Sequence, residues 1–169
     1  MSVATTRVEL ETKTGKKVPG ELAVPAGTGK APSVVLIQEW WGLNDHIRSL
    51  LSRLAAEGFL ALAPDLYHGK VTTDADEAAK LMTALDRGAA LEDIEAAATY
   101  LLGHERAGGR VGVMGFCMGG SLSFRAAETI SDFSCIVPFY GAAASPSAPP
   151  TPSATSPASS PSTAPPRPP

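Results

Sequence analysis

The chain has 169 residues, a net charge of −3 and a pI near 5.6, and 44% of its residues are hydrophobic. This length favours a single domain with its own core, and an acidic balance without a basic cluster argues against nucleic acid as a partner. No apolar run approaches the roughly 20 residues of a membrane helix. The first residues lack the apolar segment of a secretory signal, and two cysteines do not make a disulfide framework.

The first part of the chain predicts three strands. Residues 5–10 and 20–24 have strand-like composition on either side of a polar turn at 13–17, which indicates a hairpin. The continuous apolar run at 33–37 is typical of a strand that is buried on both faces of a parallel sheet. A loop at 38–44 follows this strand.

The next segment predicts a helix and then another strand. Asn44 or Asp45 can cap the first free N–H groups of the helix, and Gly58 is a suitable stop. One face of this helix is apolar at helical spacing; its residues are Ile47, Leu50, Leu51 and Leu54. The apolar run at 59–63 predicts the following strand, and residues 64–69 form its exit loop.

The second half continues the alternation of helices and strands. Helices are expected at 74–85, 91–102 and 121–128, and strands at 110–114 and 134–140. This alternation predicts an α/β fold with a mostly parallel sheet and flanking helices. Functional groups of such sheets gather where the parallel strands end, which is called the carboxyl edge below.

The turn between the strand at 110–114 and the helix at 121–128 has the pattern G-x-C-x-G-G, from Gly115 to Gly120, with Cys117 at its centre. Such a strand–turn–helix segment is typical of a nucleophile elbow. Its glycines remove side chains that would clash in the turn, and the helix N-terminus favours the thiolate. The alternative is a glycine-rich turn around a buried, inert cysteine. The strand before and the helix after favour the nucleophile.

Four segments stand out in order: Q-E-W-W-G-L-N at 38–44, A-P-D-L-Y at 63–67, the elbow at 115–120 and F-Y-G at 139–141. Together they resemble the dienelactone hydrolase family of the α/β-hydrolase superfamily, and the resemblance covers nearly all of residues 5–141. It implies the α/β-hydrolase type of fold and the hydrolysis of dienelactones and related esters by a Cys–His–Asp triad. It implies neither a cofactor nor a metal.

Carried over by position, the resemblance implies roles for four residues. Cys117 would be the nucleophile, Glu39 would help to deprotonate the thiol, and the backbone N–H groups of Trp40 and Met118 would form the oxyanion hole. The position of Glu39 agrees, because it directly follows a buried strand and a partly desolvated carboxylate there can take a proton from a thiol. The alternatives are a solvated loop acid for Glu39 and plain core or pocket wall for the tryptophan side chains.

The acid and base of the family triad have no counterpart after Cys117, because no histidine follows it. His46 and His68 follow strands, so either could approach Cys117 at the carboxyl edge, although ordinary surface histidines are the simpler interpretation. His104 and Asp132 precede strands and belong to the opposite edge.

Two further features concern the loop and helix after residue 63. Asp65 is expected to brace its loop rather than to do chemistry. The family's substrate-binding arginine is not evident, because Lys80 is the only cation at 74–85 and Arg87 is offset. The substrate therefore remains open, and esters cleaved by related esterases are alternatives to dienelactones.

Residues 142–169 consist of Ala, Ser, Pro and Thr with one Arg, a composition that cannot bury a core and predicts a disordered tail. The domain is therefore expected to span residues 1–141 and to be incomplete on its C-terminal side. One hypothesis is a genuine tail. The other is a frameshift. In a gene whose third codon positions are rich in cytosine, a shift of the reading frame moves that cytosine to the second position, and codons with cytosine there encode Pro, Ala, Thr and Ser.

The sequence thus predicts a hydrolase of lactone or carboxylic ester bonds that uses Cys117 on a small-molecule substrate, impaired as written because the triad Asp and His are missing. The alternative is a non-catalytic α/β-hydrolase-like binding module with a disordered tail. A working thiol needs a reducing compartment, so a cytoplasmic location is expected. The strand at 134–140 would be an exposed apolar edge, which predicts poor solubility.

Overall fold

The computed structural model describes residues 3–142, which form one six-stranded sheet with four helices. The strands are β1 (Thr5–Glu11), β2 (Lys17–Ala23), β3 (Ala31–Ile37), β4 (Leu60–Pro64), β5 (Ala107–Phe116) and β6 (Phe133–Phe139). The helices are α1 (Asp45–Ala56), α2 (Ala75–Ala84), α3 (Arg87–Gly103) and α4 (Met118–Thr129).

The sheet is mostly parallel, as expected. Its strand order is β1-β2-β4-β3-β5-β6. The four strands from β4 to β6 run parallel to one another, whereas β2 pairs antiparallel with both β1 and β4. The N-terminal hairpin is confirmed, with Thr5 opposite Ala23 and Glu11 opposite Lys17. The α/β fold with flanking helices is therefore confirmed.

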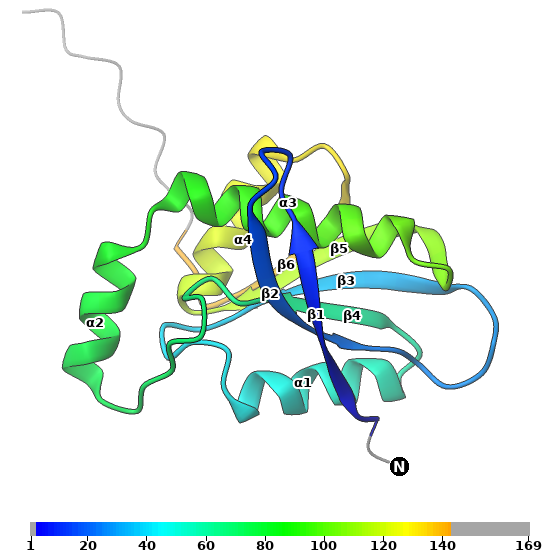
Figure 1. The fold of residues 1–169 in the computed structure, drawn as a ribbon, viewed down its shortest axis with the longest axis horizontal. Coiled ribbons are helices and arrows are strands. Elements are labelled where there is room, and N and C mark those ends of the chain that lie inside the picture. The colour runs from blue at the N-terminus through cyan, green and yellow to red at the C-terminus, as the bar shows by residue number, and fades with distance from the viewer. Residues whose placement is uncertain (1–2, 143–169) are drawn as a thin grey trace, which may run out of the picture.

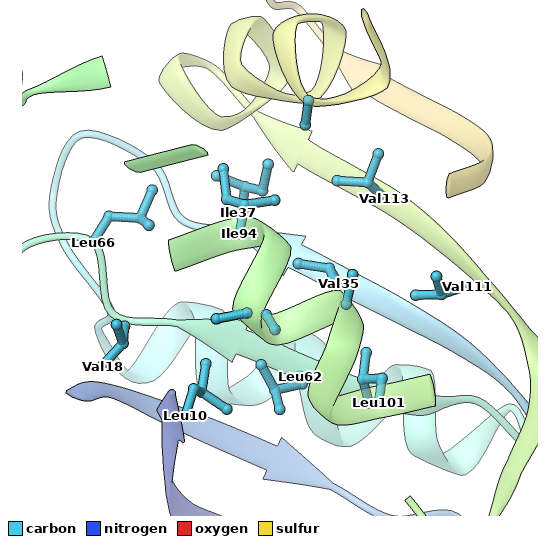
Figure 2. Packing of buried hydrophobic residues seen from close by; sticks show 14 of the residues in the cluster. Leu10, Val18, Val35, Ile37, Leu62, Leu66, Ile94, Leu101, Val111 and Val113 are labelled. Atoms are coloured by element: carbon cyan, nitrogen blue, oxygen red, sulfur yellow. The ribbon is translucent and has the colours of Figure 1, made fainter. Parts of the chain in front are cut away.

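The helices cover the two faces of the sheet unequally (Figure 1). α1 packs on one face, mainly over β2 and β4, and α3 and α4 pack on the other, while α2 lies at the periphery. The larger core lies under α3 and α4, and Figure 2 shows Ile94 and Leu101 of α3 beside Val35 and Leu62 of the sheet. The smaller core lies under α1 and includes Leu51.

Side-chain caps fix where the helices begin. The side chain of Asn44 accepts a hydrogen bond from the N–H of Ile47 at 3.1 Å, so Asn44 is the cap of α1. Gly58 follows the end of α1 with a φ of 91°, a conformation that glycine adopts without strain. Asp86 caps α3, which therefore begins at Arg87 rather than at residue 91.

Strand β6 lies at one edge of the described sheet and has a neighbour, β5, on one side. Its side chains Cys135, Val137 and Phe139 pair in register with Gly112, Met114 and Phe116 of β5. Val137 is 45% exposed and Phe139 is 40% exposed. The expected exposed apolar edge is therefore confirmed for β6 within the residues described.

Within residues 3–142, none of the helices has the length and hydropathy needed to cross a bilayer. The predicted tail lies almost wholly outside the described residues.

Candidate active site

Cys117 occupies the turn between β5 and α4. Its φ is 56° and its ψ is −117°, a conformation that is strained for a residue with a Cβ. Cys117 is the N-cap of α4, yet its side chain makes no capping hydrogen bond. The half-buried thiol is therefore not bound to the free N–H groups at the start of the helix. The backbone N–H of Cys117 donates to the carbonyl of Phe139 at 3.1 Å.

The glycines of the elbow let three backbone segments meet without side chains between them. A Cβ on Gly119 would lie 2.5 Å from the carbonyl oxygen of Ile37 and 2.6 Å from that of Gln38. A Cβ on Gly120 would lie 2.6 Å from the carbonyl oxygen of Phe139. The start of α4 therefore packs closely against the ends of β3 and β6. The helix begins at Met118 rather than at residue 121.

Glu39 lies two residues after the end of β3 and is half-buried at the same edge of the sheet. Its Oε1 accepts a hydrogen bond of 2.8 Å from the hydroxyl of Tyr140, whose own φ is 39°. This hydrogen bond is the main reason that the pKa of Tyr140 is raised, with burial and the negative charges of Glu39 and Cys117 adding to it. Tyr140 and Glu39 thus meet beside the thiol although they are 101 residues apart.

Tyr67, in the exit loop of β4, is a further residue at this edge. It is 7% exposed, and its hydroxyl donates to Sδ of Met118 at 3.3 Å. Burial and the negative charge of Cys117 raise the pKa of Tyr67 to about 12. The sequence placed Tyr67 in a loop at the carboxyl edge, and that position was the signal that it belongs to the site.

Comparison with known proteins decides the family. The model of the dienelactone hydrolase family matches residues 18–161. The chain belongs to this family.

Named relatives agree with the assignment. The protein named usf of Aquifex pyrophilus is 42% identical over 142 residues, and carboxymethylenebutenolidase 1 of Cupriavidus pinatubonensis is 32% identical over 144 residues. Each of these alignments covers 79% of this chain and 60% of the relative. A Klebsiella pneumoniae crystal structure assigned as a dienelactone hydrolase is 29% identical with a TM-score of 0.75, covering 83% of this chain and 61% of that one. The dienelactone hydrolase family member described here therefore spans about 60% of the length of the curated relatives it matches.

In this family member, Trp40 follows Glu39 and Met118 follows Cys117. The ring of Trp40 packs against the larger core and makes an edge contact with Trp41 at a centroid distance of 4.9 Å. Met118 is the first residue of α4, and the first N–H groups of a helix have no partner within the helix. Among the loop and turn hydrogen bonds of residues 3–142, neither N–H has a backbone acceptor.

The acids and histidines of this edge have structural partners. Asp65 accepts hydrogen bonds from the N–H groups of Tyr67 at 3.1 Å and Gly69 at 2.7 Å, so it braces its loop as expected. Nε2 of His68 lies 3.4 Å from Oδ2 of Asp93, a buried acid on α3 that also binds Lys16 at 3.1 Å. His68 is thus oriented toward α3.

The remaining candidates lie away from the elbow. His46 is an exposed residue of the first turn of α1. His104 and Asp132 precede β5 and β6, at the edge opposite to Cys117. In the described part of the chain, the structure brings Cys117 together with Glu39 and two tyrosines, and it places no histidine in hydrogen-bond contact with the thiol.

A pocket of about 390 Å³ adjoins the elbow. It is lined by Met82, Leu85, Arg87, Met118, Ser121, Leu122, Arg125 and Ala142. Five of these side chains are apolar and two are guanidinium groups, so the pocket suits an organic group that carries a polar or anionic end. Residues 3–142 contain no group of three or more His, Cys, Asp or Glu that could hold a metal ion.

Proposed function

We propose that this chain cleaves lactone or carboxylic ester bonds through a thioester on Cys117. The observation that carries the proposal is the strained backbone of Cys117, at the N-terminus of α4 and beside the end of β3. Strain of this kind persists where the surroundings impose it, and it clusters at functional sites. The family of the chain supports the same chemistry. The proposed substrate is a small molecule, held in part by the pocket next to Met118.

The proposed reaction uses groups that meet at the carboxyl edge. Glu39 accepts the proton of the Cys117 thiol, and the thiolate adds to the carbonyl carbon of the ester. The carbonyl π pair moves to oxygen, where the N–H groups of Trp40 and Met118 stabilise the negative charge. When the pair returns, the carbon–oxygen bond breaks, the alkoxide takes the proton that Glu39 holds, and a thioester remains. The alcohol leaves if the substrate is an ester and stays attached to the acyl group if it is a lactone. Water must then hydrolyse the thioester.

For a polypeptide of this sequence we propose that thioester hydrolysis is the slow step. Its three histidines all precede Cys117, and His68 is paired with Asp93. Loss of correct support for the base in a catalytic triad costs about 10⁴-fold in rate. A thioester needs an unoxidised thiol, so a reducing compartment such as the cytoplasm suits this chemistry.

The test is acylation of the intact chain by p-nitrophenyl acetate, followed by intact-mass and peptide mass spectrometry. One acetyl group on Cys117 that persists after the ester is removed is the expected result. The Cys117→Ala variant should carry none, and Cys135→Ala, which removes the exposed cysteine of β6, should be acylated like the unmodified chain. Acetylation of other residues alone, or no adduct, would contradict the proposal and favour a non-catalytic binding module.

A further inference from the structure

The exit loop of β4 holds Tyr67 in a fixed position beside the elbow. The N–H of Tyr67 donates to Oδ1 of Asp65 at 3.1 Å, and the N–H of Leu66 donates to Oε1 of Gln38 at 3.2 Å. The side chain of Gln38 is itself fully buried next to Glu39. Two loops at the carboxyl edge are therefore tied together, and the phenol ring between them is buried and preorganised.

The hydroxyl of Tyr67 has a weak acceptor in this structure. It donates to Sδ of Met118 at 3.3 Å, and a thioether sulfur accepts hydrogen bonds poorly. A negatively charged oxygen would be a much better acceptor, because hydrogen bonds to ions are roughly twice as strong as those between neutral groups. An oxyanion formed beside Met118 would therefore replace the sulfur at little cost.

Tyr67 is close enough to Cys117 for a negative charge on the sulfur to change the pKa of the phenol. Burial, and secondarily the negative charge of Cys117, raise the pKa of Tyr67 to about 12. The phenol consequently keeps its proton at every pH at which a cysteine thiolate would be used as a nucleophile. It can act there as a hydrogen-bond donor.

We propose that the hydroxyl of Tyr67 donates a hydrogen bond to the carbonyl oxygen of the substrate as that oxygen becomes negative, and so forms a side-chain part of the oxyanion hole. This inference rests on the proposed attack by Cys117. The carbon–sulfur bond forms, the carbonyl π pair moves to oxygen, and the phenol keeps its proton while it donates to that oxygen. The pair then returns and the carbon–oxygen bond to the alcohol breaks.

The test compares two reactions of the same thiol in the Tyr67→Phe variant. Acylation by p-nitrophenyl acetate passes through an oxyanion, whereas alkylation by iodoacetamide displaces iodide from a tetrahedral carbon and forms none. The Tyr67→Phe variant should lose about 10- to 100-fold in acylation rate and keep its alkylation rate within about twofold, because the oxyanion donor is removed and the thiol is not. Tyr100→Phe on α3 is the matched control and should change neither rate.

Each outcome decides a different point. Unchanged acylation in Tyr67→Phe would overturn this inference and leave attack by Cys117 standing. Equal losses in both reactions would overturn it too, because Tyr67 would then act on the thiol. If the unmodified chain is not acylated, both proposals fail.

A second variant covers the case in which Tyr67→Phe does not fold. Replacement of Tyr67 by 3,5-difluorotyrosine keeps the ring and hydroxyl but lowers the pKa of the phenol, so that it ionises at a lower pH than the Tyr67 phenol does. Acylation should then fall as the pH rises through this lowered pKa, where the Tyr67 enzyme still acylates, while alkylation does not fall. Acylation that rises in parallel with alkylation would contradict the role of Tyr67 as a donor.

Discussion

Cys117 is held at a φ of 56°, which costs a residue with a Cβ about 1–3 kcal/mol and persists only where surrounding contacts impose it. The contacts are visible: its N–H is bound to Phe139, and the glycines around it admit the ends of β3 and β6. Tyr140, which reaches Glu39, also has a positive φ. Two strained residues thus face the same carboxylate and thiol.

The hydrogen bond from Tyr140 to Glu39 makes a prediction about pH. The carboxylate stabilises the protonated phenol, so the pKa of Tyr140 lies above its ordinary value and its contribution to stability is lost as the pH rises through that raised pKa. Glu39→Gln removes the negative charge, so one tyrosine should ionise at lower pH in an ultraviolet titration. The shift should be absent when Glu39→Gln is introduced into a Tyr140→Phe background. A shift that persists there would assign it to another tyrosine.

At the scale of elements, the close contact between α4 and β3 depends on the absence of a side chain at Gly119. In Gly119→Ala the new Cβ would press on the carbonyl groups of Ile37 and Gln38, and overpacking of this kind costs about 1–3 kcal/mol in the free energy of unfolding. Urea unfolding measures the change. Gly103→Ala, at the end of α3, is the matched control, because a Cβ there meets no atom within 4 Å.

The control should be neutral or stabilising by up to about 1 kcal/mol, because alanine favours the helix more than glycine does. Equal unfolding midpoints for the two variants would contradict the close contact. If the Gly119→Ala protein folds, its rate of acylation by p-nitrophenyl acetate would show whether a displaced α4 also moves the thiol of Cys117.

Local sequence signals predicted the elements of this fold, because apolar runs, cap residues and glycines act within a few residues of one another. They predicted the strand–turn–helix segment around Cys117, a helix cap at Asn44 or Asp45, and the position of Glu39 after a buried strand. They did not predict that Asp93 is buried, because its partners Lys16 and His68 come from other segments. Nor could they predict the contact between Tyr140 and Glu39, which arises only when β3 and β6 flank β5. The roles of Cys117, Glu39, Trp40 and Met118 remain predictions.

At the scale of the whole molecule, the edge strand β6 carries exposed apolar side chains, since Val137 is 45% and Phe139 is 40% exposed. Met114 and Phe116 of β5, their neighbours in register, are half-buried against the smaller core. Exposed apolar strands at a sheet edge promote association with other chains. The described surface therefore supports the predicted poor solubility, which is open to direct measurement.

Val137→Lys should reduce self-association, because a charged side chain on an edge strand opposes strand pairing. Sedimentation velocity over a range of protein concentrations measures the effect. Val71→Lys adds the same charge at a residue that is 49% exposed, in the loop before α2, and should leave self-association unchanged. Equal improvement in both variants would point to net charge rather than to the β6 face.

The hydrogen bond between the N–H of Cys117 and the carbonyl of Phe139 couples the reactive centre to the periphery of the sheet. Edge strands open at lower free energy than central ones, since fewer contacts hold them. Opening of β6 at Phe139 would remove this hydrogen bond and with it one restraint on the strained backbone of Cys117. If Cys117 is the nucleophile, heating should lower the reactivity of its thiol before the core unfolds, because the edge strand that restrains it opens first.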